Sequence, residues 1–204
     1  MKDSALLPIA SAMLFAVVAW LFLATNPMQS PHFPSGFPLI KKATTTPMQL
    51  ILQSSAFMQN GSIPSKYTCD GQRDLNPPLT ISGVPEGTKT LALIVDDPDV
   101  PKAVKPDGVF DHWILFNIPS TTTEIPEGES AGVVGQNSAG NSAYTGPCPP
   151  TQYKPSTHRY VFTLYALDAS LSLFGRATKA EVLAAMAGHI IAETVLVGTY
   201  HKAG

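Results

Sequence analysis

The sequence predicts an all-β domain built from two layers of strands, and three observations support this fold class. The chain of 204 residues contains 19 prolines and 15 glycines, which argue against a helical bundle. Its composition, 44% hydrophobic and 14% charged, is sufficient for one sizeable core and excludes a chain that is disordered throughout. Short apolar runs bounded by turn residues recur along the chain, as they do in two-layer β proteins.

The N-terminal part of the chain is strongly apolar and predicts a transmembrane helix before the β domain. No Asp, Glu, Lys or Arg occurs from Ser4 to Ile40. The run from Ala5 to Ala24, as a helix, would be about 30 Å long, which is the thickness of the hydrocarbon core of a bilayer. We expect an uncleaved membrane anchor at residues 1–25. A cleaved signal peptide and a buried core helix are the alternatives.

A proline-rich tether and a single domain are expected to follow the anchor. Residues 26–47 contain several prolines and few aliphatic side chains, which favours an extended segment. Residues 48–204 have the length of one ordinary domain. A short N-terminal tail before one apolar run is usual for exported, anchored domains, so we expect the domain on the extracytoplasmic side. Lys41 and Lys42, beyond the run, favour the opposite orientation.

Four apolar runs predict the main strands of the domain. They lie at Leu91–Val95, Trp113–Asn117, Tyr160–Leu167 and Thr194–Tyr200. Because each run is apolar throughout and does not alternate, these strands should be covered on both faces. The segments between the runs are rich in Asn-Gly, Asp-Gly and Pro-Glu-Gly sequences, which favour turns.

One amphipathic helix is predicted near the C-terminus. Residues 178–181 (TKAE) have the form of a capping box, in which a threonine hydroxyl and a glutamate satisfy free N–H groups at the start of a helix. Apolar residues then follow at helical spacing, so a helix from Thr178 to Ala192 should pack one face on the sheet. His189 lies beside this face, where we expect it to pack and not to bind a ligand. The apolar face would consist of Val182, Leu183, Met186 and Ile190.

Net charge and cysteine content exclude several classes of function. A formal net charge of −2 lacks the basic excess that binding to nucleic acid requires. Two cysteines are too few for a disulfide framework or a four-thiolate zinc site. Cys69 and Cys148 can remain structural thiols or form one bridge, and both alternatives stay open at this point.

Acidic and imidazole side chains occur where the predicted strands begin and end. Asp96, Asp97 and Asp99 follow the first apolar run, and crowded carboxylates repel one another unless a cation, a histidine or backbone N–H groups lie among them. His112 and His158 each come just before or at the start of a strand, so both could meet Asp97 at one rim of the domain. Such a set suits a small anion. No close histidine spacing indicates a metal site, and none is expected.

Several short motifs occur in a characteristic order along the predicted domain. They are 67–71 (YTCDG), 84–88 (VPEGT), 97–99 (DPD) with 112–113 (HW), and 146–150 (GPCPP) with 158–160 (HRY). This pattern resembles the phosphatidylethanolamine-binding protein family. More narrowly, it is similar to the bacterial Raf-kinase-inhibitor-like branch of the YbhB/YbcL type, which shares the GPCPP run and a closing strand like 195–200 (VLVGTY). The resemblance covers residues 49–200.

The resemblance implies a Greek-key β-sandwich of two antiparallel sheets, with a small pocket at one end that accepts phosphate or a phosphoethanolamine head group. In that pocket His112 and His158 would donate hydrogen bonds to phosphate oxygens, and Asp97 would orient an imidazole or meet an ammonium group. Arg159 would either contribute to the site or pair with a carboxylate such as Asp99. The implied binding residues are Asp97, Asp99, His112, Gly146, Pro147, His158 and Tyr160, with no catalytic residue, metal or cofactor.

The expected function is therefore binding of small phosphorylated or anionic ligands without catalysis. One alternative is a hydrolase of a phosphoester or ester that uses His158 as a general base. Another is an interaction module whose pocket binds a phosphorylated or acidic loop of a partner protein. The G-x-S-x-G sequence at 128–132 and Cys148 are not expected to supply a nucleophile, because the first lacks a preceding strand and the second is flanked by prolines. Residues 137–140 (NSAG) lack the acidic and aromatic residues that the family commonly has there, which leaves the head-group preference open.

Overall fold

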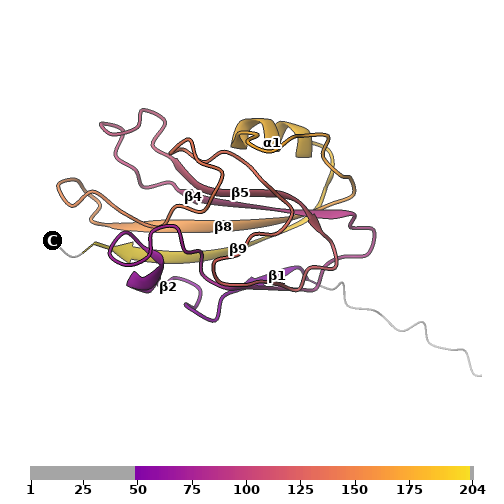
Figure 1. Cartoon of the computed structure of the whole chain (residues 1–204), viewed down its shortest axis with the longest axis horizontal. Coiled ribbons are helices and arrows are strands. Elements are labelled where there is room, and N and C mark those ends of the chain that lie inside the picture. The colour runs from indigo at the N-terminus through magenta and orange to yellow at the C-terminus, as the bar shows by residue number, and fades with distance from the viewer. Residues whose placement is uncertain (1–48, 203–204) are drawn as a thin grey trace, which may run out of the picture. The chain divides into compact units, whose positions relative to one another are not determined.

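The computed structural model describes residues 49–202, which fold into two sheets, one α-helix and one 3-10 helix (Figure 1). The larger sheet has the strand order β2-β9-β8-β4-β5-β7, and the smaller has the order β1-β3-β6. In chain order the elements are β1 (Ile51–Gln53), β2 (Gly61–Ser62), the 3-10 helix (Ser65–Tyr67), β3 (Leu79–Ser82), β4 (Thr90–Asp97), β5 (Phe110–Pro119), β6 (Glu124–Ile125), β7 (Val133–Val134), β8 (Thr157–Leu167), α1 (Lys179–Met186) and β9 (Ile190–His201).

The four predicted strands are confirmed as the centre of the larger sheet. Each apolar run lies within one of the long strands β4, β5, β8 and β9, which are hydrogen-bonded to one another in antiparallel pairs. The remaining strands were not predicted. They have two to four residues each, and such short segments show no recognisable periodicity.

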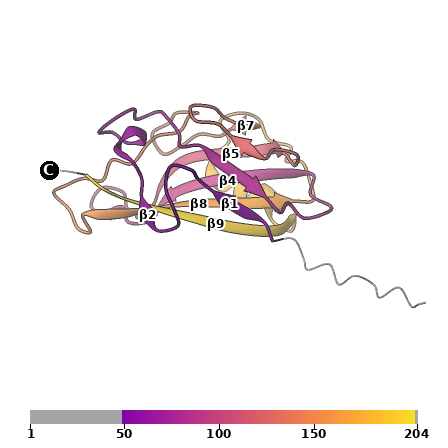
Figure 2. The ribbon, with the colours of Figure 1, turned by 90° about the horizontal axis from the view of Figure 1, so that it is seen from below.

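The larger sheet is buried on both faces, which explains why its strands are apolar throughout. Along β4, Leu91, Leu93 and Val95 belong to the core shared with the smaller sheet, whereas Ala92 and Ile94 belong to a second core under α1. Figure 1 shows α1 on one side of the strands β4, β5, β8 and β9, and Figure 2 shows β1 crossing their other side. The domain therefore has three layers, with the larger sheet in the middle.

Two parts of the predicted fold class are corrected by the structure. The larger sheet is mixed, not purely antiparallel, because β2 pairs with β9 in parallel, with Gly61 opposite Gly198. The part of the chain that the structure describes, residues 49–202, is a mostly β domain with one α-helix, and no helix in it is long and apolar enough to be the transmembrane helix of the predicted fold class. The anchor expected at residues 1–25 and the tether expected at 26–47 lie outside the described residues.

The start of the predicted helix is confirmed, but its end is wrong. The Thr178 hydroxyl accepts a hydrogen bond from the Glu181 N–H, and the Glu181 carboxylate accepts one from the Thr178 N–H at 2.7 Å, which completes the capping box. The helix ends at Met186 and not at Ala192. Gly188 has a φ of 81°, a left-handed conformation that favours glycine and reverses the chain before β9.

The shorter helix changes the environment of the residues that follow it. Val182 and Met186 are buried as predicted, whereas Leu183 is 39% exposed and Ile190 is 45% exposed at the first position of β9. His189 is not packed on the sheet. It is exposed, and its Nδ1 lies 2.8 Å from the Asp168 carboxylate.

Candidate functional site

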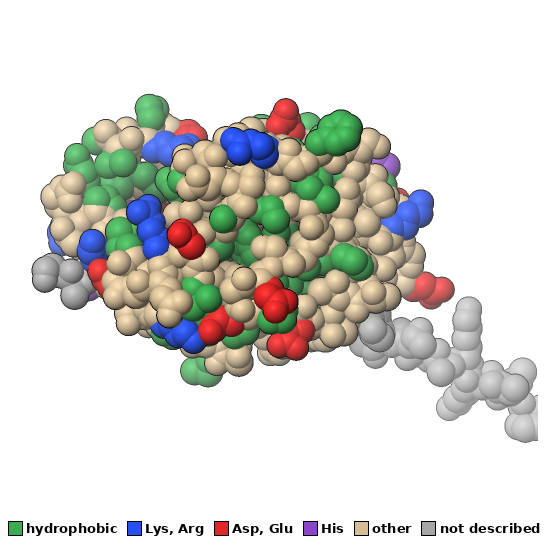
Figure 3. Space-filling view, viewed as in Figure 1, with side chains coloured by type: hydrophobic (Ala, Val, Ile, Leu, Met, Phe, Trp, Pro, Cys, Tyr) green, Lys and Arg blue, Asp and Glu red, His purple; other side chains and the backbone are tan. Residues whose placement is uncertain are grey.

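A pocket of about 200 Å³ lies where β4 ends and where β5 and β8 begin. Four ionisable residues line it from separate parts of the chain: Arg73, Asp97, His112 and His158. Its apolar wall consists of Val100, Val104, Phe110, Pro149 and Pro150. Figure 3 shows hydrophobic side chains gathered with Lys and Arg side chains at the end of the molecule where these loops lie.

Asp97 and His158 form a buried pair in the pocket wall. They come from the end of β4 and the start of β8, and their side chains project toward the core between the two sheets. The His158 Nδ1 lies 2.7 Å from the Asp97 carboxylate, which also accepts a hydrogen bond from the Asp99 N–H. Burial raises the pKa of Asp97, and the hydrogen bond from His158 opposes that shift. The other His158 ring nitrogen, Nε2, is buried without a hydrogen-bond partner.

A β-bulge turns His112 toward the same pocket. Val95 is opposite Trp113, but the next residue, Asp96, is opposite Asp111, so His112 is the extra residue in β5. Strict alternation from the buried Trp113 would place His112 on the α1 side of the sheet. The extra residue reverses this assignment, so Asp111 meets α1 and His112 reaches the pocket.

The hydrogen bonds of His112 define what the ring can offer to a ligand. Its Nδ1 donates to the Thr145 carbonyl, which is an acceptor only, so Nδ1 carries the proton. Burial lowers the pKa of His112 to about 4, and the ring is neutral at neutral pH. In this tautomer Nε2 has a lone pair and no proton. The predicted role of His112 as a donor to phosphate oxygens does not fit this geometry.

The three crowded carboxylates are separated, and each has a partner of its own. Asp96 faces α1, where the Lys179 ammonium lies 2.9 Å from both Asp96 and Asp111. Burial raises the pKa of Asp96 to about 6 despite this contact. Asp97 pairs with His158 as described above. Asp99 lies outside the pocket wall and accepts hydrogen bonds from the Arg159 guanidinium, which lower the pKa of the Asp99 carboxyl.

Gly146 lies in the pocket wall because the neighbouring backbone leaves no room for a side chain. A Cβ at this position would be 2.3 Å from the Tyr67 carbonyl oxygen and 2.9 Å from the Arg73 carbonyl oxygen. The Gly146 N–H donates to the same Arg73 oxygen at 2.7 Å. Position 146 therefore requires glycine because the segment from Tyr67 to Arg73 packs directly against it. The backbone of Gly146 connects this segment to the wall of the pocket.

We expect the Gly146→Ala variant to be less stable than the parent by about 1–3 kcal/mol, the usual cost of forcing an additional carbon into a packed site. Urea unfolding measures the difference. Gly175→Ala is the matched control, since a Cβ there would meet only the Val134 carbonyl oxygen at 3.9 Å. An equal change in the two variants would contradict the assigned role of Gly146.

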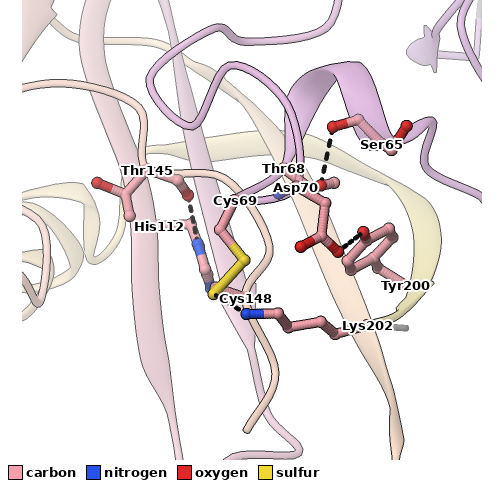
Figure 4. Close-up of a disulfide and its surroundings, with 9 residues drawn as sticks. All are labelled: Ser65, Thr68, Cys69, Asp70, His112, Thr145, Cys148, Tyr200 and Lys202. Atoms are coloured by element: carbon pink, nitrogen blue, oxygen red, sulfur yellow. Dashed lines mark hydrogen bonds between the residues drawn. A yellow bond between two sulfur atoms is a disulfide. The ribbon is translucent and has the colours of Figure 1, made fainter. Parts of the chain in front are cut away.

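A disulfide joins the two loops at this wall. Cys69 and Cys148 are bonded, with their Cα atoms 5.4 Å apart, which decides between the two alternatives that the sequence left open. Next to the bond, the Pro147 carbonyl accepts a hydrogen bond from the Cys69 N–H. Cys148 lines the pocket, and Figure 4 shows the disulfide with the hydrogen bond from His112 to Thr145 and with Lys202, whose ammonium lies 3.9 Å from the Cys148 sulfur.

The structure brings together four of the seven predicted site residues. Asp97, His112, Gly146 and His158 line the pocket, whereas Asp99, Pro147 and Tyr160 do not. Tyr160 lies behind His112, with the ring centroids 5.1 Å apart in an edge-on arrangement, and its hydroxyl is buried without a partner.

Sequence reasoning missed Arg73 and Thr145. Arg73 lies two residues after the YTCDG motif, and Thr145 immediately precedes the GPCPP run. Their closeness to these motifs was the only available sign, since a single loop arginine or threonine has no pattern of its own. Within residues 49–202, no group of three or more His, Cys, Asp or Glu side chains is arranged to hold a metal ion.

The fold and the pocket define a β-rich protein with a small polar pocket at one end of its central sheet, and the sequence comparison identifies the family. The chain belongs to the phosphatidylethanolamine-binding protein family, which matches residues 53–201. Within it, the chain falls in the bacterial YbhB/YbcL-like branch.

Three relatives illustrate this assignment. A UPF0098 protein from Chlamydia pneumoniae is 46% identical over 156 residues, a match that covers 76% of this chain and 99% of that protein. The crystal structure of a phosphatidylethanolamine-binding protein homologue from Chlamydia trachomatis is 44% identical, with a TM-score of 0.72 over 76% of this chain and 99% of that one. The crystal structure of Escherichia coli YbcL, described as a member of the mammalian family, is 28% identical, with a TM-score of 0.67 over the same shares of the two chains.

Proposed function

We propose that this protein binds a small phosphorylated or otherwise anionic ligand in the pocket formed by Arg73, His112 and His158. The observation that carries the proposal is the His158 Nε2, a polar atom that is buried without a partner in a residue that lines the pocket. An unpaired buried polar group costs about 1–3 kcal/mol, and a ligand oxygen or hydroxyl placed against it would recover that free energy.

The charges around the pocket favour an anion. Arg73 is the only Lys or Arg among the described residues that line it, and its guanidinium can hold two oxygens of one phosphate group. The negative charge of Asp97 is directed at the imidazole of His158 and at the Asp99 N–H, so it is already compensated. The apolar wall lowers the local dielectric constant, which strengthens the electrostatic attraction inside the pocket.

We propose binding without turnover, because the pocket contains no free nucleophile. Cys148 is held in the disulfide and cannot form a thiolate. Ser130, the serine of the G-x-S-x-G sequence, is exposed in the loop between β6 and β7 and does not line the pocket. The Asp97 and His158 pair has the chemistry of a general base, but the Thr145 hydroxyl of the pocket is engaged by the Asn137 amide and is not hydrogen-bonded to that pair.

Isothermal titration of the purified protein with inorganic phosphate and with phosphoethanolamine tests this function. We expect saturable binding of one ligand per chain, and no release of phosphate when phosphoethanolamine is incubated with the protein. Absence of binding up to millimolar ligand would overturn the proposal. Release of phosphate in proportion to the protein concentration would instead favour the hydrolase alternative.

We also propose that the domain works outside the cytoplasm. The support is the disulfide between Cys69 and Cys148, since such bonds persist in oxidising compartments and are rare in the cytosol. Alkylation of cells of the native host before lysis tests this location: both cysteines should resist labelling until a reductant is added. Labelling without reductant would contradict it.

A further inference from the structure

Both histidines of the pocket have their Nδ1 engaged by another residue, which leaves Nε2 of each ring for a ligand. The His158 Nδ1 is directed at the Asp97 carboxylate, and the His112 Nδ1 at the Thr145 carbonyl. A carbonyl oxygen only accepts, so the proton of a neutral His112 resides on Nδ1. Because His112 lines the pocket, the atom that it offers there is Nε2 with its lone pair.

The Thr145 carbonyl is held in place by a network of hydrogen bonds. The buried Asn137 donates from its Nδ2 to the Thr145 hydroxyl at 3.0 Å and to the Ala143 carbonyl at 2.9 Å. Its Oδ1 accepts from two backbone N–H groups of the same loop, and the Thr145 N–H donates to the His112 carbonyl at 3.0 Å. This network fixes the loop against β5, so the proton on His112 Nδ1 keeps its partner.

The groups around His112 keep the ring neutral. Phe110 and Tyr160 pack against it, with ring centroids at 4.7 and 5.1 Å, and only 5% of the residue is exposed. The ionisable groups that influence it are Arg73 and His158, which disfavour a second proton, and Asp111, which favours one. Asp111 is engaged by Lys179 on the other face of the sheet, and Asp97 by His158. Desolvation is the dominant influence on His112.

We propose, on the basis of the function proposed above, that the pocket selects anions that carry a proton of their own. A phosphate group with a P–O–H hydrogen can donate that hydrogen to His112 Nε2 while its other oxygens accept from Arg73. An anion with acceptor oxygens only would place an oxygen lone pair against the nitrogen lone pair and leave both unpaired. The ligand class is therefore the protonated form of phosphate or of a phosphate monoester. Sulfate and phosphate diesters, which lack this proton, should bind more weakly.

Four small anions test this selectivity by isothermal titration. Inorganic phosphate keeps at least one proton from pH 5.5 to pH 8, methyl phosphate loses its last proton near pH 6, and sulfate and dimethyl phosphate have none in this range. We expect inorganic phosphate to bind at least about tenfold more tightly than sulfate, and methyl phosphate more tightly than dimethyl phosphate at pH 5.5. Between pH 5.5 and pH 8, the affinity for methyl phosphate should fall roughly 80-fold, in proportion to its protonated fraction. The affinity for inorganic phosphate should change far less over the same pH range. It serves as the control for changes in the protonation of the protein itself.

The His112→Gln variant provides a second measurement. A glutamine amide can donate a hydrogen bond to a bare anion oxygen, so the discrimination against sulfate should shrink in this variant. If the variant does not fold cooperatively, the comparison of the four anions on the parent protein still decides the question.

The outcomes separate this inference from the proposed function. Equal affinity for phosphate and sulfate would overturn the selectivity but not the proposed anion pocket. The same holds if the affinities for methyl phosphate and inorganic phosphate change equally with pH. Absence of binding by all four anions would overturn both.

Discussion

Replacing His158 with alanine is expected to weaken phosphate binding by at least about thirtyfold. The imidazole is completely buried, and its Nε2 is the unpaired polar atom that the ligand is proposed to meet. A hydrogen bond to a charged group contributes about 1.5–3 kcal/mol, and 1.4 kcal/mol corresponds to a factor of ten in affinity. The substitution also leaves the Asp97 carboxylate facing the pocket without its partner, which adds repulsion against an anion. Titration calorimetry of the variant with inorganic phosphate measures the loss.

His189→Ala is the matched control for this experiment. His189 also has its Nδ1 within hydrogen-bond distance of an aspartate, Asp168 at 2.8 Å, but that pair is exposed and does not line the pocket. We expect the control to bind phosphate like the parent. The variant at position 158 must first be shown to unfold cooperatively in urea, because it leaves a buried carboxylate unpaired. A folded His158→Ala protein with parental affinity would refute the assignment of the pocket.

Removing the disulfide is expected to lower the free energy of unfolding by about 4 kcal/mol. Cys69 and Cys148 are 79 residues apart in the sequence, and a cross-link over a long loop restricts the unfolded chain strongly. Urea unfolding of the Cys69→Ala/Cys148→Ala variant measures this difference. Phosphate binding should weaken as well, because the bond ties the segment with the pocket residues Gly146 and Cys148 to the loop that leads to Arg73.

Reductant provides the internal control for the disulfide. The parent protein in dithiothreitol should unfold like the double variant, and the double variant should not respond to dithiothreitol. A parent protein whose stability is the same with and without reductant would show that the bond contributes nothing to the folded state. An effect of reductant on the double variant would point to a cause other than this bond.

The central strands, and most of the residues that they bring to the pocket, could be predicted from the amino-acid sequence alone. Unbroken apolar runs such as Leu91–Val95 predicted strands covered on both faces, and the structure confirms a central sheet between a second sheet and α1. The capping box predicted the start of α1 because it is a local arrangement of four residues. Asp97, His112 and His158 were recognised because each stands at the end of a predicted strand, where loops meet.

Other features of the site depended on pairing between distant segments. Whether His112 faces the pocket or α1 depends on one extra residue in β5, and a bulge is defined only by the partner strand. The partners of the three aspartates come from α1 and β8, more than fifty residues further along the chain. The predicted helix was too long because Ile190 satisfies helical spacing as well as the first position of a strand.

The position of the proton on His112 shows most clearly which properties can be predicted from the sequence and which depend on the folded structure. The sequence supplied a histidine next to a strand and therefore a plausible donor. The tertiary structure buried it against Phe110 and Tyr160 and placed the Thr145 carbonyl against its Nδ1, which leaves an acceptor for the ligand. Residue type and local spacing are properties of the sequence. Tautomer and charge follow from burial and from hydrogen bonds between segments that meet only in the folded chain.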